Sequence, residues 1–290
     1  NQSQHWMHLT ILLDNDICQD RISGSVVIRK TGCVSSKTVI QGVVILQVII
    51  VLDSHGGLFS RRRITLCEEK KSMEFRLEGT NSFEFSRSDL EKRLNILLPD
   101  SYSGYGIHVN YRLIAKTKSV FPYIRTEQLV QTKEAKDGSS DSAELYISKN
   151  DINDFDGLLC SSRVDFVPEI HITCKVASSW IHIRDGISGT LMIEQCNMEI
   201  QSISVGVVQT EMLRIRNLQH ELHVVRDTTE IACGDCYRHQ EIPFVFYPDS
   251  EGVSSDYEGP DAQIHFSLRV KVLFTNQFFC VKYLPVHFSW

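Results

Sequence analysis

Apolar and polar residues alternate over many short segments of this chain, and clusters of glycine, asparagine, aspartate or serine separate one segment from the next. This pattern is typical of β-sandwich strands, because every second side chain of such a strand points into the core. In the first half of the chain we expect strands at residues 6–13, 22–30, 39–52, 62–67, 73–77, 107–116 and 123–132. In the second half we expect them at residues 145–147, 169–176, 187–194, 200–209, 212–218, 242–247, 264–274 and 278–288. Both halves are therefore predicted to be all-β.

One segment departs from the strand pattern, and another interrupts it. Residues 88–97 carry leucines at helical spacing, so they form either one short helix or a loop that leads into a strand at residues 94–98. Residues 134–142 are small and polar, lack apolar periodicity and lie near the midpoint, as expected of a linker. We therefore expect two β-sandwich domains, residues 1–136 and 137–290. The pattern alone permits two arrestin-like domains and two immunoglobulin-like domains equally.

Length and composition agree with two folded domains. The chain has 290 residues, enough for two domains that each bury a core without metals or disulfides. Apolar residues make up 42% and charged residues 23%, which excludes wholesale disorder.

The formal net charge of -6 argues against a general affinity for nucleic acid or anionic lipid, because both ligands bind more tightly to proteins with an excess of basic residues. One local exception is the pair of clusters Arg61–Arg63 and Lys70–Lys71, which could contact acidic lipid or an acidic peptide. Glu68 and Glu69 lie between the two clusters, so a solvated hairpin tip is the favoured interpretation.

Sequence patterns for membrane insertion are missing. No window has the roughly 18 consecutive apolar residues that a membrane helix needs, and the most apolar run, residues 39–52, is interrupted by Gln41, Gly42 and Gln47. No signal peptide is recognised, and the absence of an initiator methionine suggests that the chain begins inside a longer protein. We expect any membrane contact to be peripheral.

The cysteines do not follow a disulfide framework. Nine of them, at positions 18, 33, 67, 160, 174, 196, 233, 236 and 280, are an odd number scattered through apolar strands. This distribution predicts free thiols in a reducing cytosol.

The search for chemistry gives two weak candidate metal sites. Cys233, Cys236 and His239 have a spacing that could reach one Zn²⁺, but a structural zinc site needs four ligands, so plain loop thiols are favoured over zinc or a redox dithiol. An acidic cluster near residues 14–20 could suggest Ca²⁺, but a polar turn is the favoured interpretation. No catalytic or nucleotide-binding motif is recognised. We expect no enzymatic activity, no cofactor and no metal.

The stretch from Arg226 to Tyr247 is the most informative part of the chain. Residues 241–247 form a short apolar run of the kind that becomes a buried sandwich strand. Gly234 permits a backbone turn that a side chain would obstruct. We therefore expect an exposed loop over residues 232–240, suited to contact and not to catalysis.

Motifs in this stretch and elsewhere resemble one family. The string Arg226-Asp-x-Thr-Glu-Ile231, then Gly234-Asp235, Arg238 and Ile242-Pro243, resembles the vacuolar protein sorting 26 family, the small arrestin-fold subunits of the retromer and retriever coats. The Gly234-Asp235 pair is more similar to the retriever-type branch. Further matches, in the family's order, are Ile22-Ser-Gly-Ser-Val-Val-Ile28, Ile40-Gln-Gly-Val-Val-Ile-Leu-Gln-Val48, Tyr102-Ser-Gly-Tyr-Gly-Ile-His-Val-Asn-Tyr-Arg-Leu113 and Ile187-Ser-Gly-Thr-Leu-Met-Ile193. The resemblance spans roughly residues 6–288.

The resemblance implies two consecutive arrestin-like β-sandwich domains in a non-enzymatic scaffold subunit. It implies a cytoplasmic protein, peripheral on endosomes through its complex, that supports retrieval and recycling of membrane cargo. Its second domain would dock on a helical-solenoid coat subunit of the vacuolar protein sorting 35 type, and sorting nexins and cargo tails are further partners. The residues that match the docking loop of the family are Ile231, Ala232, Cys233, Gly234, Asp235, Tyr237 and Arg238.

Two other functions remain open at this point. An arrestin-type adaptor would bind receptor tails directly, although none of the seven prolines adjoins another to give the Pro-Pro-x-Tyr motif that such adaptors often carry. An extracellular β-sandwich module for adhesion or Ca²⁺ binding would need paired cysteines.

Overall fold

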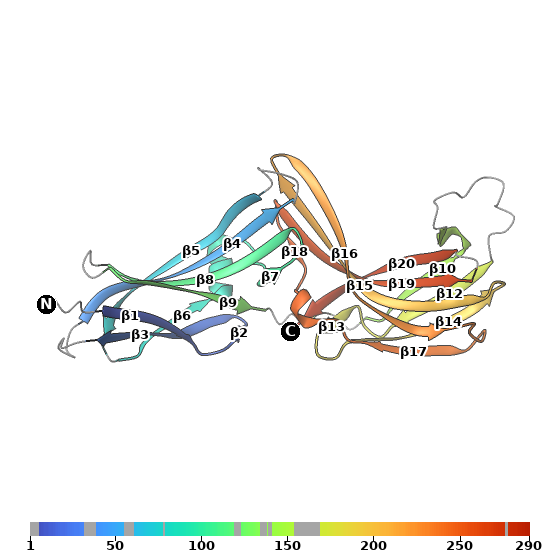
Figure 1. The fold of residues 1–290 in the computed structure, drawn as a ribbon, viewed down its shortest axis with the longest axis horizontal. Helices are drawn as coiled ribbons and strands as arrows, with labels where there is room; N and C mark the ends of the chain where they lie inside the picture. Colours follow the sequence, from blue (N-terminus) through green and yellow to red (C-terminus); the bar gives the residue numbers. More distant parts are fainter. Residues whose placement is uncertain are drawn as a thin grey trace. The chain divides into compact units, whose positions relative to one another are not determined.

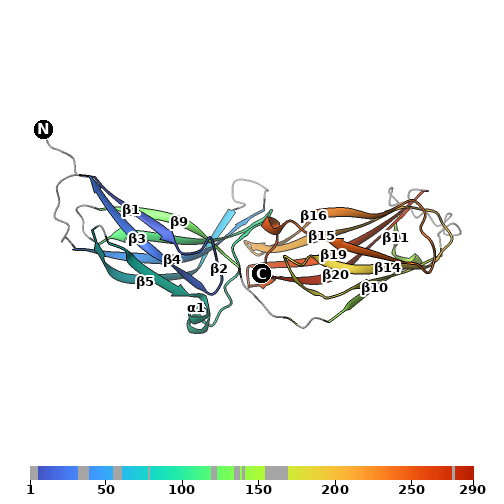
Figure 2. The same cartoon turned by 90° about the horizontal axis from the view of Figure 1, so that it is seen from below.

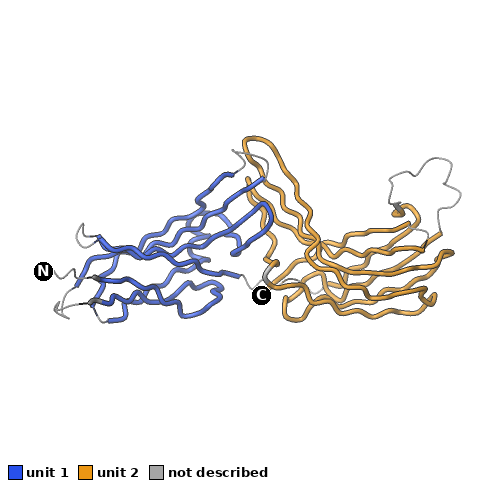
Figure 3. The backbone as a smooth tube through the Cα atoms, viewed as in Figure 1, with its two compact units in different colours: residues 1–135 blue, residues 136–290 orange. Residues whose placement is uncertain are grey.

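The computed structural model describes residues 6–31, 39–54, 61–77, 79–118, 123–133, 138, 141–153, 169–275 and 278–290. The described chain consists almost entirely of strands (Figure 1). It divides into two compact units, residues 1–135 and residues 136–290, which are coloured separately in Figure 3. Each unit contains two sheets and is a β-sandwich, so the prediction of an all-β chain with two consecutive sandwich domains is confirmed.

The first unit pairs a small sheet with a larger one. The strands of the small sheet are, in spatial order, β1 (Trp6–Leu13), β3 (Arg21–Thr31) and β6 (Asn81–Ser86). Those of the larger sheet are β2 (Ile17–Cys18), β9 (Arg125–Thr132), β8 (Ile107–Thr117), β4 (Val39–Asp53) and β5 (Arg61–Arg76), with β7 (Tyr102–Ser103) paired to β8. The core lies between the sheets, where Val44, Leu46 and Val48 of β4 are fully buried at every second position.

The short helix α1 (Arg87–Leu94) belongs to the first unit and is labelled in Figure 2. Ser86 caps its first turn by accepting a hydrogen bond from the backbone N–H of Asp89, and Asn95 ends it in the left-handed conformation. The buried Arg87 guanidinium forms ion pairs with Asp100 at 2.8 Å and with Glu91 at 3.3 Å. The helical alternative for residues 88–97 is therefore correct, and no strand forms over residues 94–98.

The second unit is built in the same way. The strands of its smaller sheet are β10 (Ala143–Ser148), β12 (Ile170–Val176), β14 (Ile187–Cys196) and β17 (Glu241–Phe246). Those of its larger sheet are β11 (Ile152–Asn153), β20 (Phe279–Ser289), β19 (Ala262–Phe274), β15 (Ile200–Ile215) and β16 (Leu218–Cys233), with β13 (Trp180–His182) beside β20 and β18 (Tyr257–Glu258) beside β19. Two short 3-10 turns, Lys149–Asp151 and Ser250–Gly252, complete it.

The two units share one topology. Strands β1 to β9 recur in the same order, and with the same neighbours, as β12 to β20. Even the two short parallel pairings correspond, since β2 lies parallel to β9 and β13 lies parallel to β20. The fold is therefore a duplicated sandwich to which the second unit adds β10 and β11.

A glycine and a phenylalanine mark equivalent places in the two units. Gly24 of β3 lies opposite Phe83 of β6, and Gly189 of β14 lies opposite Phe244 of β17. A Cβ atom on Gly24 would approach the carbonyl oxygen of Leu12 to 2.2 Å, and one on Gly189 would approach the carbonyl oxygen of Lys175 to 2.3 Å. Both glycines are therefore required by close packing in the middle of a strand.

Several expected strand limits were wrong. The expected strands at residues 62–67 and 73–77 belong to the single strand β5, which ends at Arg76, and those at residues 200–209 and 212–218 belong to the single strand β15, which ends at Ile215. Strands β6 and β16 were not predicted. The basic clusters Arg61–Arg63 and Lys70–Lys71 lie within β5 and not at a hairpin tip, while residues 55–60, which connect β4 to β5, lie outside the described part of the chain.

Candidate functional site

The candidate docking residues lie at the end of β16 and in the loop that follows it. Ile231, Ala232 and Cys233 are the last three residues of β16, and the loop proper runs over residues 234–240 to β17. The expected loop over residues 232–240 thus starts two residues too early, because Ala232 and Cys233 still pair with Ile203 and Ser202 of β15.

Ile231 occupies a β-bulge. Ala232 pairs with Ile203 and Glu230 pairs with Ser204, so Ile231 is the extra residue between two successive pairs. A bulge bends its strand and increases the local twist. The end of β16 therefore leaves the regular sheet before the chain enters the loop, and the Ile231 side chain is half-exposed there.

Gly234 sets the start of the loop. Its φ angle of 83° lies in the left-handed region, and its backbone N–H donates to the carbonyl oxygen of Gln201 at 2.8 Å. No atom lies within 4 Å of the place where a Cβ would stand. Glycine is therefore favoured here by its backbone conformation and not by lack of space.

Arg238 holds the loop against the connection between β14 and β15. Its Nε and Nη2 atoms donate to the carbonyl oxygen of Cys196 at 3.1 Å and 3.0 Å, and Nη2 also approaches the carbonyl oxygen of Met198 at 3.3 Å. Its Nη1 atom donates to the carbonyl oxygen of Cys236 and lies 3.1 Å from the Asp235 carboxylate. The guanidinium thus has internal partners on all its nitrogens, and its first role is to shape the loop.

The Asp235 side chain also attaches the loop to the neighbouring strand. Its carboxylate accepts a hydrogen bond from the backbone N–H of Ile200 at 3.3 Å and pairs with Arg238. Partial burial by itself raises the pKa of Asp235, but these hydrogen bonds and the nearby positive charge outweigh burial and hold the pKa below its usual value. The carboxylate is therefore charged and fixed, and it joins the loop to the first residue of β15.

His239 closes the loop. It adopts a φ angle of 61°, and its backbone N–H donates to the carbonyl oxygen of Ile193 at 2.8 Å. A residue other than glycine in this conformation is uncommon, so the surrounding contacts impose it. The loop is thus attached by backbone or side-chain hydrogen bonds to residues 193–201 at several points.

The outward-facing part of the loop is small and partly aromatic. Tyr237 is 82% exposed, Cys233 at the end of β16 is exposed too, and Ala232 is half-exposed. A fixed loop that presents a solvent-exposed tyrosine is suited to contact with another macromolecule, since tyrosine buries a large area at a low entropic cost.

The thiols of the loop are not arranged around a metal. The Cys236 thiol donates to the carbonyl oxygen of Gly234 at 3.6 Å, and burial raises its pKa. Within the described residues, no group of three or more histidine, cysteine, aspartate or glutamate side chains could hold a metal ion. The seven cysteines in the described ranges are free thiols, and Cys33 and Cys160 lie outside those ranges.

The acidic turn between β1 and β3 has a structural role. The Asp20 carboxylate accepts a hydrogen bond from the backbone N–H of Ser88 at 2.8 Å, at the start of α1. That hydrogen bond is the main cause of the lowered pKa of Asp20. Asp20 therefore stabilises the N-terminus of the helix.

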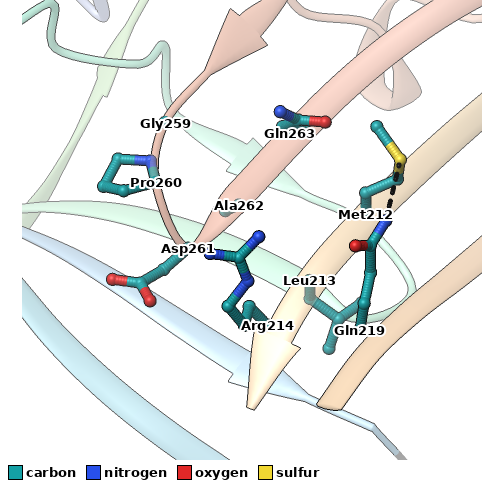
Figure 4. Close-up of a pocket in the computed structure, with 9 residues that line it drawn as sticks. All are labelled: Met212, Leu213, Arg214, Gln219, Gly259, Pro260, Asp261, Ala262 and Gln263. Atoms are coloured by element: carbon teal, nitrogen blue, oxygen red, sulfur yellow. Dashed lines mark hydrogen bonds between the residues drawn. The ribbon is translucent and has the colours of Figure 1, made fainter. Parts of the chain in front are cut away.

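A hollow elsewhere in the second unit is too small to be a ligand site. It lies between the β15–β16 turn and the β18–β19 connection, where the Gln219 amide donates to the Met212 sulfur at 3.7 Å (Figure 4). Its volume is about 80 Å³. Ligand pockets usually occupy roughly 300–1,000 Å³, so this hollow does not compete with the loop as a candidate site.

No family model and no curated protein matches the chain. Among the described residues, no helix combines the length and the apolar character that a transmembrane span needs.

The expected site residues lie at the end of β16 and in the loop that follows it, but two features of this segment were missed. These are the bulge at Ile231 and the internal engagement of Arg238, for which the Asp235-x-x-Arg238 spacing was the available signal.

Proposed function

We propose that this chain is a non-enzymatic scaffold subunit of a retromer-type or retriever-type endosomal coat. Its second unit docks through the end of β16 and the loop 234–240 on a helical-solenoid subunit of the vacuolar protein sorting 35 type. In this role it is a cytoplasmic protein that reaches endosomes as part of the complex, where it supports retrieval and recycling of membrane cargo.

The single observation that carries this proposal is a rigid loop with an exposed aromatic tip. Arg238 and Asp235 tie the loop to the β14–β15 connection, while Tyr237 is 82% exposed. A loop that is already ordered loses little conformational entropy on binding, and a tyrosine at its tip is a frequent source of interface energy. Both properties are those expected of a docking element.

The duplicated topology gives further support. The sequence resemblance implies two consecutive sandwiches of one kind, and β1 to β9 and β12 to β20 have the same order and the same neighbours. The two units differ at the candidate loop. The connection equivalent to it in the first unit joins Arg76 to Asn81 and is shorter than the connection from Cys233 to Glu241. The extra length belongs to the unit for which docking is proposed.

We assign two roles to the seven candidate residues, contact with the partner and shaping of the loop. Ile231 and Tyr237 supply apolar contact area, with Ala232 and Cys233 beside them. Gly234, Asp235 and Arg238 give the loop its shape, so their substitution weakens docking by altering the positions of the first group.

Co-purification with the solenoid subunit tests the proposal. We expect Tyr237→Ala to weaken the complex about tenfold or more and to leave thermal unfolding unchanged, because the side chain is exposed. Tyr283→Ala is the matched control, since Tyr283 is 55% exposed on β20 of the same unit. Equal retention of the Tyr237 and Tyr283 variants by the solenoid subunit would show that the loop is not part of the interface. Failure of the unmodified chain to bind any solenoid subunit would reject the scaffold role.

A further inference from the structure

The outer face of the larger sheet in the first unit contains an open hollow of about 550 Å³. It crosses four neighbouring strands, β5, β4, β8 and β9. The register of the sheet places the lining side chains on one face, since Val51 lies opposite Arg63, Ile49 lies opposite Asn110, and Arg112 lies opposite Leu129. The residues that line it are Ile49, Val51, Arg61, Arg63, Asn110, Arg112 and Leu129.

The floor of this hollow is unexpectedly apolar. An antiparallel sheet with one face toward solvent normally alternates apolar and polar residues. Strand β4 departs from that rule, because its outward residues Ile49 and Val51 are aliphatic like its core residues and are only 2% and 8% exposed. Leu129 on β9 adds a third aliphatic side chain, which is 61% exposed. Ile49 and Val51 are thus already covered, as are Val43, Ile45 and Ile114 farther along the same face, so Leu129 is the accessible aliphatic side chain of the lining.

The polar part of the lining is basic. Arg61 and Arg63 extend from β5 and are exposed, and Arg112 extends from β8. Arg112 lies 2.7 Å from the Glu127 carboxylate, which Arg125 also contacts at 3.1 Å, so one carboxylate is shared between two arginines. No acidic residue is among the residues that line the hollow. The site therefore has an excess of guanidinium groups above an aliphatic floor.

We propose that this hollow binds an acidic peptide in an extended conformation. Carboxylates of the peptide pair with Arg61, Arg63 and Arg112, because guanidinium groups bind carboxylates with two parallel hydrogen bonds. An aliphatic side chain of the peptide contacts Leu129, which is the exposed aliphatic residue of the lining. The distance from β5 to β9 is about 14 Å, which an extended segment of roughly four residues spans.

Charge complementarity favours a peptide over a membrane. The same outer face carries Glu68 opposite Gln47 and Glu127 opposite Ile114 as well as Lys70 opposite Ile45, so a flat anionic bilayer would meet charges of both signs. The net charge of -6 opposes an acidic peptide and an anionic bilayer alike. A narrow ligand that reaches into the hollow meets the three arginines without meeting Glu68.

Fluorescence polarisation with the full chain tests this proposal. The probe is a short fluorescein-labelled peptide of alternating glutamate and leucine, compared with a peptide of the same length in which glutamine replaces glutamate. We expect the glutamate peptide to bind more tightly, and the double variant Arg61→Gln, Arg63→Gln to weaken that binding about tenfold or more. Leu129→Ala is expected to weaken binding of this peptide more than binding of a glutamate–serine peptide.

Arg76→Gln is the matched control. Arg76 is an exposed arginine of the same strand and lies opposite Val39, about 40 Å along β4 from Val51. An equal loss of affinity in Arg76→Gln would show only non-specific charge attraction and would overturn the proposal, as would equal binding of the glutamate and glutamine peptides. Binding to phosphatidylserine-containing vesicles that depends on Arg61 and Arg63, without binding of the peptide, would overturn it in favour of a membrane.

Discussion

Arg238 lies 3.1 Å from the Asp235 carboxylate and, through the same guanidinium, donates two hydrogen bonds to the carbonyl oxygen of Cys196. The first contact joins two residues of one loop, and the second joins that loop to the end of β14. A segment without regular secondary structure thereby acquires a defined conformation. The proposed docking surface depends on this arrangement, because Tyr237 stands between the two charged residues in sequence.

Loss of the Arg238 side chain is expected to cost more than loss of the Asp235 side chain. Arg238→Ala removes both of the guanidinium hydrogen bonds to the Cys196 carbonyl oxygen and the one to the Met198 carbonyl oxygen, so we expect the free energy of unfolding to fall by about 1–2 kcal/mol. The coupling between Asp235 and Arg238 is expected to stay below about 1 kcal/mol, because both side chains are partly exposed. Urea unfolding of the two single variants and the double variant measures these quantities. A coupling well above that limit would contradict the loop geometry described above.

Acid is expected to loosen the same loop. The pKa of Asp235 is lowered in the folded protein from its usual 3.8. Its charged form therefore contributes stability above pH 3.8, and this contribution is lost as the pH falls through the lower, folded-state pKa. Protection of the amides of residues 234–240 against hydrogen exchange, relative to the intrinsic rate at each pH, should fall in that acid range, and the fall should be smaller in Asp235→Asn. Identical acid profiles for the two proteins would show that another group is responsible.

The strand glycines are expected to tolerate no side chain. Gly24→Ala and Gly189→Ala each drive a Cβ into a backbone carbonyl oxygen and toward a phenylalanine ring, so we expect each to destabilise the chain by about 1–3 kcal/mol. Gly252→Ala is the control, because its Cβ would lie 3.5 Å from an Arg226 side-chain atom, an ordinary contact. Thermal unfolding of the three variants checks the prediction. Wild-type stability of Gly189→Ala would mean that β14 and β17 do not pack as described.

The buried ion pair of the first unit is expected to be sensitive to loss of one partner. Asp100→Ala leaves the Arg87 guanidinium buried without the carboxylate that lies 2.8 Å away, at a cost of about 3–5 kcal/mol. Glu91→Ala should cost less, because that carboxylate is farther from Arg87 and more exposed. Chemical denaturation distinguishes the two, and the reverse order would contradict the assigned geometry.

Much of the architecture could be predicted from the chain, because buried strands with one polar face leave a clear periodicity. The strict alternation of β19 and the Phe-x-Phe segment of β17 are examples. Strand β16 could not be recognised in this way. It is an edge strand with most residues exposed, so its sequence lacks the alternation that burial would impose. Strand β5 is an edge strand too, which explains why its charged residues resembled a hairpin tip.

The candidate loop was only partly predictable, for a different reason. Gly234 was recognisable, since a residue with a positive φ angle is commonly glycine. The partners of Arg238 were not, because Cys196 and Met198 are distant in sequence and contribute only backbone oxygens, which carry no side-chain signal. An arginine that appeared available for a partner is therefore engaged within its own domain.

Hydrogen–deuterium exchange of the chain with and without the solenoid subunit tests the central claim most directly. The account predicts that complex formation slows exchange in the segment from Ile231 to Arg238, while exchange in β5 of the first unit stays unchanged. Formation of a stable complex in which this segment exchanges as fast as in the isolated chain would contradict it.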